Sequence, residues 1–176
     1  MKTNPLVTIG IATYNSEHTV QKSIDSAVSQ DWDNLEIIII DDCSSDSTWE
    51  IVSSFVDVRI KTHRNLENMG AGYTRNKILS ESRGDVICFL DDDDIALPNR
   101  VSCQIRTMIS HGYPLIHKVI NVCGMIRCYP NGYLRDLKPL GTYSSTPTPI
   151  QLIDYILFNQ AVSYTHLRAH ETLRYL

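Results

Sequence analysis

Short apolar runs alternate with segments of periodic apolar positions along residues 1–112. Three runs are continuous and rich in β-branched residues, which is typical of strands buried on both faces of a parallel sheet. A fourth is shorter and alternates apolar with polar residues. The strands expected from these runs are residues 6–12, 35–40, 58–62 and 85–90. Apolar residues between the runs recur every three or four positions and predict helices. The expected fold class is therefore α/β, a mostly parallel sheet flanked by helices.

Capping and turn-forming residues mark the ends of the expected helices. Asp46 or Ser47 can cap the second helix, and Gly84 stands where a C-cap is expected after the third. Among the apolar positions expected to face the core are Val56 of the second helix and Ile109 of the fourth. The four helices are expected at about residues 17–30, 48–56, 73–82 and 98–112.

The pattern changes after residue 112. Further strands are expected at residues 115–122 and 125–129, followed by a hairpin turn at 130–132. A loop and a helix over 150–159 complete this part. We therefore divide the chain into residues 1–112, 113–162 and 163–176. The last segment resembles a read-through of cloning or sequencing adapters, so we interpret it as a non-native tail and leave it out of fold reasoning.

Composition narrows the class of protein. The 176 residues are enough for one domain, and with 43% apolar and 20% charged residues the chain is globular. The net charge of −4 gives no electrostatic basis for nucleic-acid binding. Five cysteines without a C-x-x-C pair indicate free thiols in a reducing compartment. No signal peptide or apolar stretch of membrane-spanning length is present, so a cytoplasmic location without a membrane span is expected.

The most distinctive chemistry lies in four consecutive carboxylates, Asp91 to Asp94. They follow a strand directly, and ligands of open α/β sheets bind outside the carboxyl ends of the strands. Carboxylate oxygens at such a point suit Mg²⁺ or Mn²⁺, which commonly bind one or two carboxylates together with substrate phosphates. A solvated turn whose acids cap the next helix is the alternative reading.

Two other expected strands also end in polar residues. Thr13, Tyr14 and Asn15 follow the first strand, and Asp41 and Asp42 follow the second. In a parallel sheet all of these ends share one edge, so we expect one composite site. An aromatic ring can stack on a base, a carboxylate can accept a ring N–H, and a carboxylate cluster can hold a metal ion that bridges a diphosphate. Together these groups indicate a nucleoside-diphosphate site.

Four segments in this order resemble the family 2 glycosyltransferases. They are residues 7–15, residues 39–48 with their Asp-Asp-Cys-Ser-Ser-Asp-Ser-Thr sequence, residues 68–76, and residues 90–94, which resemble the family's metal motif. The resemblance implies a GT-A-type fold, in which a nucleotide-sugar-binding α/β half precedes an acceptor-binding half. Residues 1–112 would form the first half, and residues 113–162 an incomplete version of the second.

The resemblance also implies roles for individual residues. Tyr14 would stack on the base, and Asp42 would accept a hydrogen bond from its ring N–H. Asp93 and Asp94 would bind Mg²⁺ or Mn²⁺, and Asp92 is the acid expected to tolerate substitution best. The nucleotide-binding residues implied are Ala12, Thr13, Tyr14, Asp42, Arg75, Asp91 and Asp93.

The chain departs from the family pattern at two points. Ala12 stands where many members have proline, which removes no functional group. The family's catalytic base is a carboxylate, usually in an acidic pair, well downstream of the metal motif. Between Asp94 and the tail the only acids are Asp136 and Asp154, and neither belongs to such a pair. We therefore expect the chain to lack the base and to transfer little or no sugar by itself.

The resemblance implies an inverting transferase that moves a sugar from a nucleoside-diphosphate sugar, expected to be a UDP-sugar, to a glycan or lipid-linked acceptor. It also implies that the transfer takes place at the inner face of the membrane. Two alternatives stay open. One is a catalytically inactive module that binds nucleotide sugars. The other is a metal-dependent nucleotidyltransferase. Such an enzyme would need a glycine-rich phosphate loop after the first strand, and residues 13–16 contain no glycine.

Overall fold

The computed structural model describes residues 4–110 with their side chains and four strand segments beyond them, residues 120–121, 125–128, 134–137 and 142–143. The chain divides into two compact units. One comprises residues 2–102, and the other comprises residues 103–176 together with Met1.

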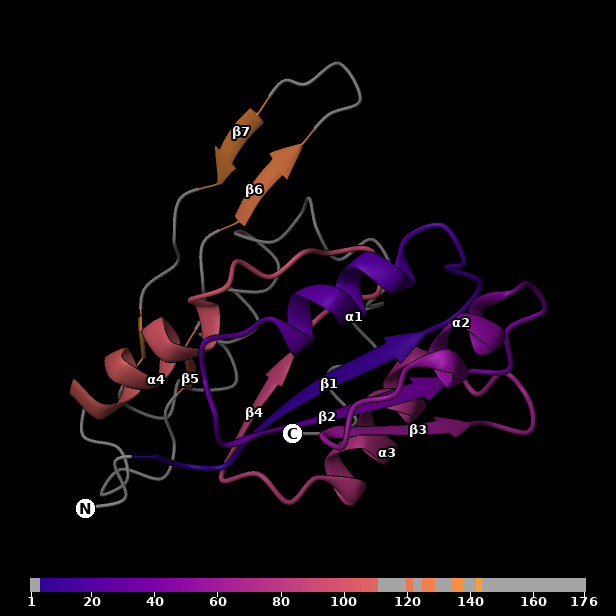
Figure 1. Cartoon of the computed structure of the whole chain (residues 1–176), viewed down its shortest axis with the longest axis horizontal. Coiled ribbons are helices and arrows are strands. Elements are labelled where there is room, and N and C mark those ends of the chain that lie inside the picture. The colour runs from indigo at the N-terminus through magenta and orange to yellow at the C-terminus, as the bar shows by residue number, and fades with distance from the viewer. Residues whose placement is uncertain (1–3, 111–119, 122–124, 129–133, 138–141, 144–176) are drawn as a thin grey trace. The chain divides into compact units, whose positions relative to one another are not determined.

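The first unit is built on a four-stranded parallel sheet with the strand order β3-β2-β1-β4 (Figure 1). The strands are β1 (Val7–Thr13), β2 (Leu35–Asp41), β3 (Ile60–Arg64) and β4 (Val86–Phe89). Every neighbouring pair is parallel. This arrangement confirms the predicted parallel α/β sheet.

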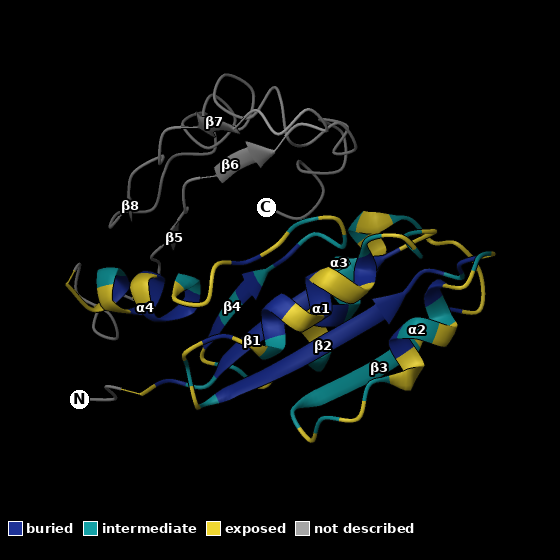
Figure 2. Cartoon of the chain, turned by 45° about the horizontal axis from the view of Figure 1, so that its top comes forward, coloured by how far each residue is buried: buried dark blue, intermediate teal, exposed yellow. Residues whose placement is uncertain are grey.

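The two central strands form the core because their side chains are apolar on both faces. All seven residues of β2 are buried, and β1 is buried except at Ala12, whereas the edge strand β3 is only half-buried (Figure 2). On one face, Ile78 packs with Ile38 and Ile40. Gly10 makes this contact possible, because a Cβ there would lie 2.6 Å from Ile78 Cγ2.

Three helices connect and flank these strands: α1 (Val20–Val28), α2 (Thr48–Ser54) and α3 (Ala71–Glu81). Helix α4 (Arg100–Ser110) follows β4 and begins in the first unit and ends in the second. Helix α1 contacts α2, while α3 packs on β1 and β2. The chain moves outward from β1 to β3 and then returns to β4. Right-handed crossovers therefore place α1 and α2 on one face of the sheet and α3 on the other (Figure 1). None of the helices in the described part of the chain is long and apolar enough to cross a membrane.

Several predicted boundaries and core positions were wrong. Strand β3 begins at Ile60 rather than at Val58, because Asp57 holds a turn through the backbone N–H of Arg59. Val58 is fully exposed as a result. Val56 is also fully exposed, because α2 ends at Ser54 and the next residue is already extended. Ile109, predicted to face the core, is 36% exposed.

Gly84 is not the C-cap that the sequence suggested. Helix α3 ends at Glu81, and Ser82 is already extended with φ −70° and ψ 141°. A Cβ on Gly84 would lie 2.7 Å from the backbone nitrogen of Thr8 and would also collide with the Thr8 hydroxyl. Glycine is needed here because the chain entering β4 passes directly against β1.

The second unit contains two described antiparallel pairs. Strand β5 (Ile120–Asn121) pairs with β8 (Thr142–Tyr143), and β6 (Met125–Cys128) pairs with β7 (Leu134–Leu137). The β6–β7 pairing confirms the predicted hairpin partners. The predicted turn at 130–132, the helix at 150–159 and the tail at 163–176 lie outside the described residues.

Candidate functional site

The polar segments that follow the strands meet at one edge of the sheet. Thr13 at the end of β1 pairs with Asp41 at the end of β2, and Asp41 pairs with Arg64 at the end of β3. Leu90, directly after β4, donates its backbone N–H to Gly10 of β1 at 3.0 Å. The segments that carry Tyr14, the Asp41–Asp42 pair and the acidic run therefore share this edge, as parallel pairing requires.

Asp41 is a buried structural acid. Its side chain is fully buried and accepts hydrogen bonds from Arg64 Nε at 3.1 Å, from the Ser44 backbone N–H at 3.1 Å and from the Ser44 hydroxyl. Arg64 in turn lies over the Trp49 ring, with its guanidinium carbon 5.7 Å from the ring centroid. Asp41 thus fixes the loop after β2 and presents no free group to a ligand.

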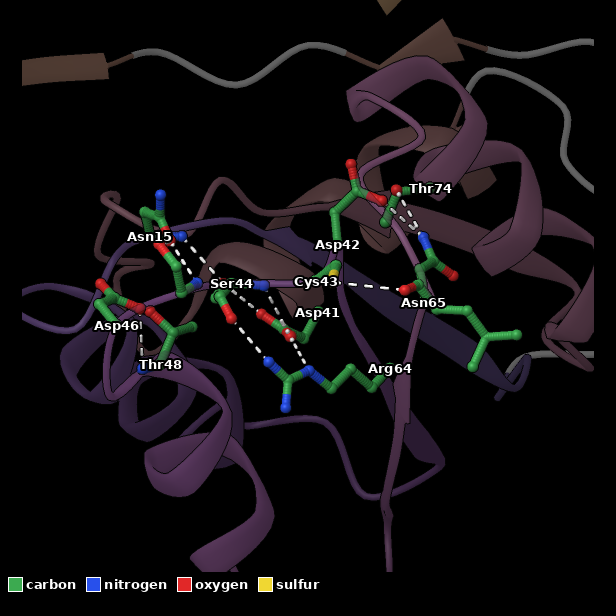
Figure 3. A network of polar contacts seen from close by, with 12 residues as sticks. Asn15, Asp41, Asp42, Cys43, Ser44, Asp46, Thr48, Arg64, Asn65 and Thr74 are labelled. Atoms are coloured by element: carbon green, nitrogen blue, oxygen red, sulfur yellow. Dashed lines mark hydrogen bonds and ion pairs between the residues drawn. The ribbon is translucent and has the colours of Figure 1, made fainter.

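Asp42 has a different set of partners. Its Oδ1 accepts hydrogen bonds from Asn65 Nδ2 at 2.7 Å and from the Met69 N–H at 3.0 Å, and its Oδ2 accepts one from the Gly70 N–H at 2.7 Å. Asp42 is 3% exposed, and because a carboxylate has about four lone-pair sites, these bonds leave one acceptor site, on Oδ2. Figure 3 shows one oxygen of Asp42 turned toward Asn65 and the other turned away.

The loops after β1 and β2 are fastened together. Asn15, in the left-handed region with φ 50°, donates its backbone N–H to Ser44 Oγ at 2.9 Å and accepts the Ser45 N–H at 2.8 Å (Figure 3). At the start of α2, Asp46 Oδ1 accepts the Thr48 N–H at 3.0 Å. Burial would raise the pKa of Asp46, but hydrogen bonds from Thr48 and Glu17 outweigh it and lower that pKa. Of the two predicted capping residues, Ser47 occupies the N-cap position and makes no side-chain cap hydrogen bond, while Asp46 binds the first N–H of the helix from the position before it.

Tyr14 extends from this rigid base. Tyr14 is 47% exposed, so it is accessible to a ligand. Its backbone N–H donates to Asp92 Oδ2 at 3.2 Å. This bond joins the loop after β1 to the acidic run after β4. The expectation that Asp92 tolerates substitution best overlooked this contact, because nothing in the local sequence couples residues 78 positions apart.

Arg75 and Asp91 form an ion pair at the same edge. Arg75 Nη2 lies 2.9 Å from Asp91 Oδ1, and both side chains are about one-quarter exposed. The Ser23 hydroxyl of α1 donates to the Asp91 carbonyl at 2.9 Å. Asp91 is thus anchored to α3 by its carboxylate and to α1 by its backbone. Arg75 uses one guanidinium nitrogen for this pair, and its other N–H donors can serve a phosphate.

Asp93 and Asp94 follow this anchored residue. Asp93 is exposed and has no polar side-chain partner among the described residues. The Asp94 N–H donates to the Asp91 carbonyl at 3.1 Å, which closes the turn. Residues 4–110 contain no cluster of three or more acidic, histidine or cysteine side chains placed to hold a metal. Mg²⁺ or Mn²⁺ held by two carboxylates and completed by phosphate oxygens and water needs no such cluster, so these residues fit the ion.

Ala12 and Thr13 have packing and loop contacts in the structure. Ala12 packs against the cluster of Ile38, Ile40 and Ile78. The Thr13 hydroxyl bonds to Ser16 Oγ at 2.5 Å, and its carbonyl accepts the Asp42 N–H at 2.9 Å. Their contact with a nucleotide remains a prediction.

The family model described as "Glycosyl transferase family 2" matches residues 8–145, which is most of the chain. The chain belongs to this family. The match extends from β1 into the second unit, and apart from Val7 it includes the four segments on which the resemblance rested.

Curated relatives of this glycosyltransferase chain agree with the family assignment. It is 36% identical over 143 residues to the Escherichia coli protein "UDP-Glc:alpha-D-GlcNAc-diphosphoundecaprenol beta-1,3-glucosyltransferase WfaP". The aligned region covers 81% of this chain and 52% of the relative. It is 39% identical over 112 residues to a second Escherichia coli glucosyltransferase, WfgD, covering 64% of the chain and 44% of the relative. The chain thus spans about half the length of these two relatives.

Solved glycosyltransferases share the fold. Residues 1–349 of Staphylococcus aureus TarS in complex with UDP superimpose with a TM-score of 0.56 and 28% identity, over 60% of this chain and 32% of that one. The mannosyltransferase PcManGT from Pyrobaculum calidifontis, in complex with GDP-Man and Mn²⁺, gives a TM-score of 0.57 at 22% identity, over 72% of this chain and 36% of that one. The predicted GT-A fold is confirmed.

Two residues of this edge were missed from the sequence. Arg64 and Asn65 form the end of β3 and the position after it, where the strand-end argument would have found them. The predicted strand stopped at residue 62 and the predicted loop began at Asn65, so neither residue was placed at a strand end. The missing information was where β3 ends.

Proposed function

We propose that this chain supplies the donor site of an inverting glycosyltransferase that moves a sugar from a UDP-sugar to an acceptor hydroxyl. The observation that carries the proposal is the single acceptor site left on Asp42, on the same sheet edge as the exposed Tyr14 and the acidic run. Uracil linked to ribose has one ring N–H, which matches the acceptor site of Asp42, and a flat face, which can stack on the ring of Tyr14. A diphosphate with a divalent cation matches the third.

Each residue has a role in this proposal. Tyr14 stacks on the uracil, and Asp42 Oδ2 accepts its ring N–H. Arg75, held in place by Asp91, binds the diphosphate through its remaining N–H groups. Asp93 contacts the ribose or the metal ion. Ala12 and Thr13 line the base, and Asp94 binds the metal ion.

Asp93 and Asp94 would hold Mg²⁺ or Mn²⁺, which would neutralise the negative charge of the departing diphosphate. The acceptor oxygen attacks the anomeric carbon while the bond to the diphosphate oxygen breaks, so the configuration inverts. The base that removes the acceptor proton is not assigned to a residue. Of the acids considered from the sequence, Asp136 lies in β7, and Asp154 lies outside the described residues.

The relatives suggest which substrates to try first. Two are named as enzymes that use UDP-glucose with a diphosphoundecaprenol-linked sugar, and TarS has been solved with UDP and UDP-GlcNAc. We propose UDP-glucose as the first donor to test and a lipid-linked sugar as the acceptor class. Such an acceptor would place the reaction at the cytoplasmic face of a membrane.

Calorimetric titration of the chain with UDP, with and without Mn²⁺, tests the donor site. We expect UDP to bind at least about tenfold more tightly with Mn²⁺, because the ion bridges carboxylates and diphosphate. Asp94→Asn should lose this enhancement and keep the weak metal-independent binding. Asp25→Asn, which removes one negative charge from the exposed surface of α1, is the matched control and should behave as wild type.

Metal-independent binding of equal strength, or no preference for UDP over GDP, would overturn the proposal. A turnover assay with UDP-glucose and a lipid-linked acceptor addresses the non-enzymatic alternative. Metal-dependent UDP binding without any transfer would favour a nucleotide-sugar-binding module.

Asp92 should matter for affinity through its bond to Tyr14. Asp92→Ala removes the acceptor for the Tyr14 N–H, and we expect the dissociation constant of UDP to rise about three- to tenfold. Asp92→Asn keeps an oxygen that can accept this bond and should stay within about twofold of wild type. Calorimetry with UDP and Mn²⁺ on both variants checks this. Equal weakening in both would instead indicate that the charge of Asp92 matters.

A further inference from the structure

Asn65 is a buried amide directly after β3 that holds the carboxylate of Asp42. Its side chain is 6% exposed, and every polar atom on it has a partner. Nδ2 donates to Asp42 Oδ1 at 2.7 Å and to Thr74 Oγ1 at 3.2 Å, and Oδ1 accepts from Lys77 Nζ at 3.0 Å. Figure 3 shows the amide nitrogen of Asn65 turned toward both Asp42 and Thr74.

The chemistry of these partners fixes the direction of the amide. The Lys77 ammonium can only donate and must face the amide oxygen, whereas the Asp42 carboxylate can only accept and must face the NH₂ group. A flipped Asn65 would turn its oxygen toward the carboxylate and its NH₂ toward the ammonium, and both contacts would be repulsive. Lys77 of α3 therefore selects the orientation in which Asn65 binds the end of β2.

This arrangement determines which part of Asp42 can meet a ligand. Asn65 and the Met69 N–H together fill the acceptor sites of Oδ1, and the Gly70 N–H takes one site of Oδ2. The carboxylate cannot rotate without breaking these bonds, so its last acceptor site has a fixed direction.

We infer that Asn65, oriented by Lys77, is a positioning residue that makes the site selective for a base with a ring N–H. The inference rests on the proposed function and deepens it, because it concerns how Asp42 recognises the base. Without Asn65, Oδ1 loses its shortest hydrogen bond, and the carboxylate gains freedom to turn. A misdirected carboxylate would bind uracil poorly and would also discriminate poorly.

The test compares UDP with N3-methyl-UDP, in which a methyl group replaces the ring N–H. In wild type with Mn²⁺ we expect the methyl group to weaken binding by about 10- to 100-fold, the value of a hydrogen bond to a charged group. In Asn65→Ala we expect this penalty to fall to about threefold or less. Calorimetry gives both dissociation constants for each protein, and the readout is their ratio.

The ratio separates positioning from a general structural defect. A loosened fold would weaken UDP and N3-methyl-UDP alike and leave the ratio unchanged. Lys77→Leu removes the donor that orients Asn65 and should lower the ratio, whereas Lys77→Gln keeps an N–H donor and should retain it. Lys77 is only half-buried, so these variants keep the test valid if Asn65→Ala fails to fold. Lys22→Leu, at an exposed lysine of α1, is the control and should match wild type.

Each outcome has a defined meaning. A wild-type ratio in Asn65→Ala and in Lys77→Leu overturns the inference and leaves the proposed function intact. If wild type binds both nucleotides equally, the proposed contact of Asp42 with the ring N–H fails, and the inference fails with it. If wild type binds neither nucleotide, the proposed donor site itself is wrong. When both nucleotides bind equally, a Mn²⁺ dependence of UDP binding would show that the diphosphate end of the site still functions and that only the contact with the ring N–H has failed.

Discussion

Asp42→Ala should lose UDP binding and fold stability together. The carboxylate accepts three N–H groups, from Asn65, Met69 and Gly70. Its removal leaves Nδ2 of the buried Asn65 and the backbone groups at the start of α3 without their acceptor. An unsatisfied buried donor costs about 1–3 kcal/mol, and the half-exposed backbone groups can turn to water, so we expect a loss of about 3 kcal/mol in the free energy of unfolding. Urea unfolding measures this loss.

The same substitution should weaken UDP by about 100-fold, because the ring N–H loses a charged acceptor. Asp42→Asn gives the sharper test. The ring N3 of uracil donates a hydrogen bond, whereas N3 of cytosine accepts one. An amide at position 42 can donate from its NH₂ group, so Asp42→Asn should shift the preference from UDP toward CDP.

Calorimetry with both nucleotides and Mn²⁺ gives the preference as a ratio of dissociation constants. Asp33→Asn removes one exposed negative charge ahead of β2 and serves as the control. If Asp42→Asn keeps the wild-type ratio of UDP to CDP, Asp42 does not contact the base edge, and its role is confined to the start of α3.

The fold could be predicted where the sequence pattern is local. The continuous apolar run over residues 37–40 identified β2 correctly, because a strand covered on both faces is typically apolar on both faces. The same logic placed β1 and β4, and parallel pairing then required their polar ends to meet at one edge. Boundaries set by a single side chain were less predictable. Asp57 moved the start of β3, and the close approach of the chain to Thr8 explains Gly84 better than a helix cap does.

The different roles of the neighbouring acids in the site could not be predicted from the sequence. Asp41 and Asp42 are adjacent and chemically identical, yet alternation along β2 turns one toward Arg64 and the other toward Asn65. Asp92 meets Tyr14 across 78 positions. Such contacts depend on strand register and loop path, which no local periodicity encodes. The family resemblance supplied expected roles for individual acids, and the contacts add which groups hold them in place.

Glu36 is expected to be the main stabilising acid of the sheet. It is 3% exposed and accepts hydrogen bonds from Thr8 Oγ1 at 2.8 Å, from Lys61 Nζ at 3.1 Å and from the Arg83 backbone N–H at 2.6 Å. Burial would raise its pKa, but the Arg83 N–H, the Thr8 hydroxyl and the two cations outweigh burial and lower the pKa from 4.5 to about 2. The difference corresponds to about 3 kcal/mol of stability at neutral pH.

Glu36→Gln keeps the size of the side chain and removes its charge, so it should lose a large part of that stability at pH 7. Because the folded pKa of Glu36 is depressed, its contribution is complete above pH 4.5 and is lost as the pH falls toward 2. The gap in unfolding free energy between wild type and Glu36→Gln should therefore shrink by about 2 kcal/mol between pH 7 and pH 3. Urea unfolding at several pH values measures the gap.

Asp57 also has a low pKa, because hydrogen bonds from Arg59 lower it to about 2. Asp57 is present in both wild type and Glu36→Gln, so the comparison of these two proteins isolates the effect of Glu36. Glu50→Gln, at an exposed glutamate of α2, should show no such gap. Because Glu36 lies near the amino end of β2, away from the edge that carries Asp42, Glu36→Gln should bind UDP as wild type does wherever it is folded. A gap that stays constant from pH 7 to pH 3 would mean that the carboxylate charge does not stabilise the sheet, and that Thr8 and Arg83 need only an oxygen at this position.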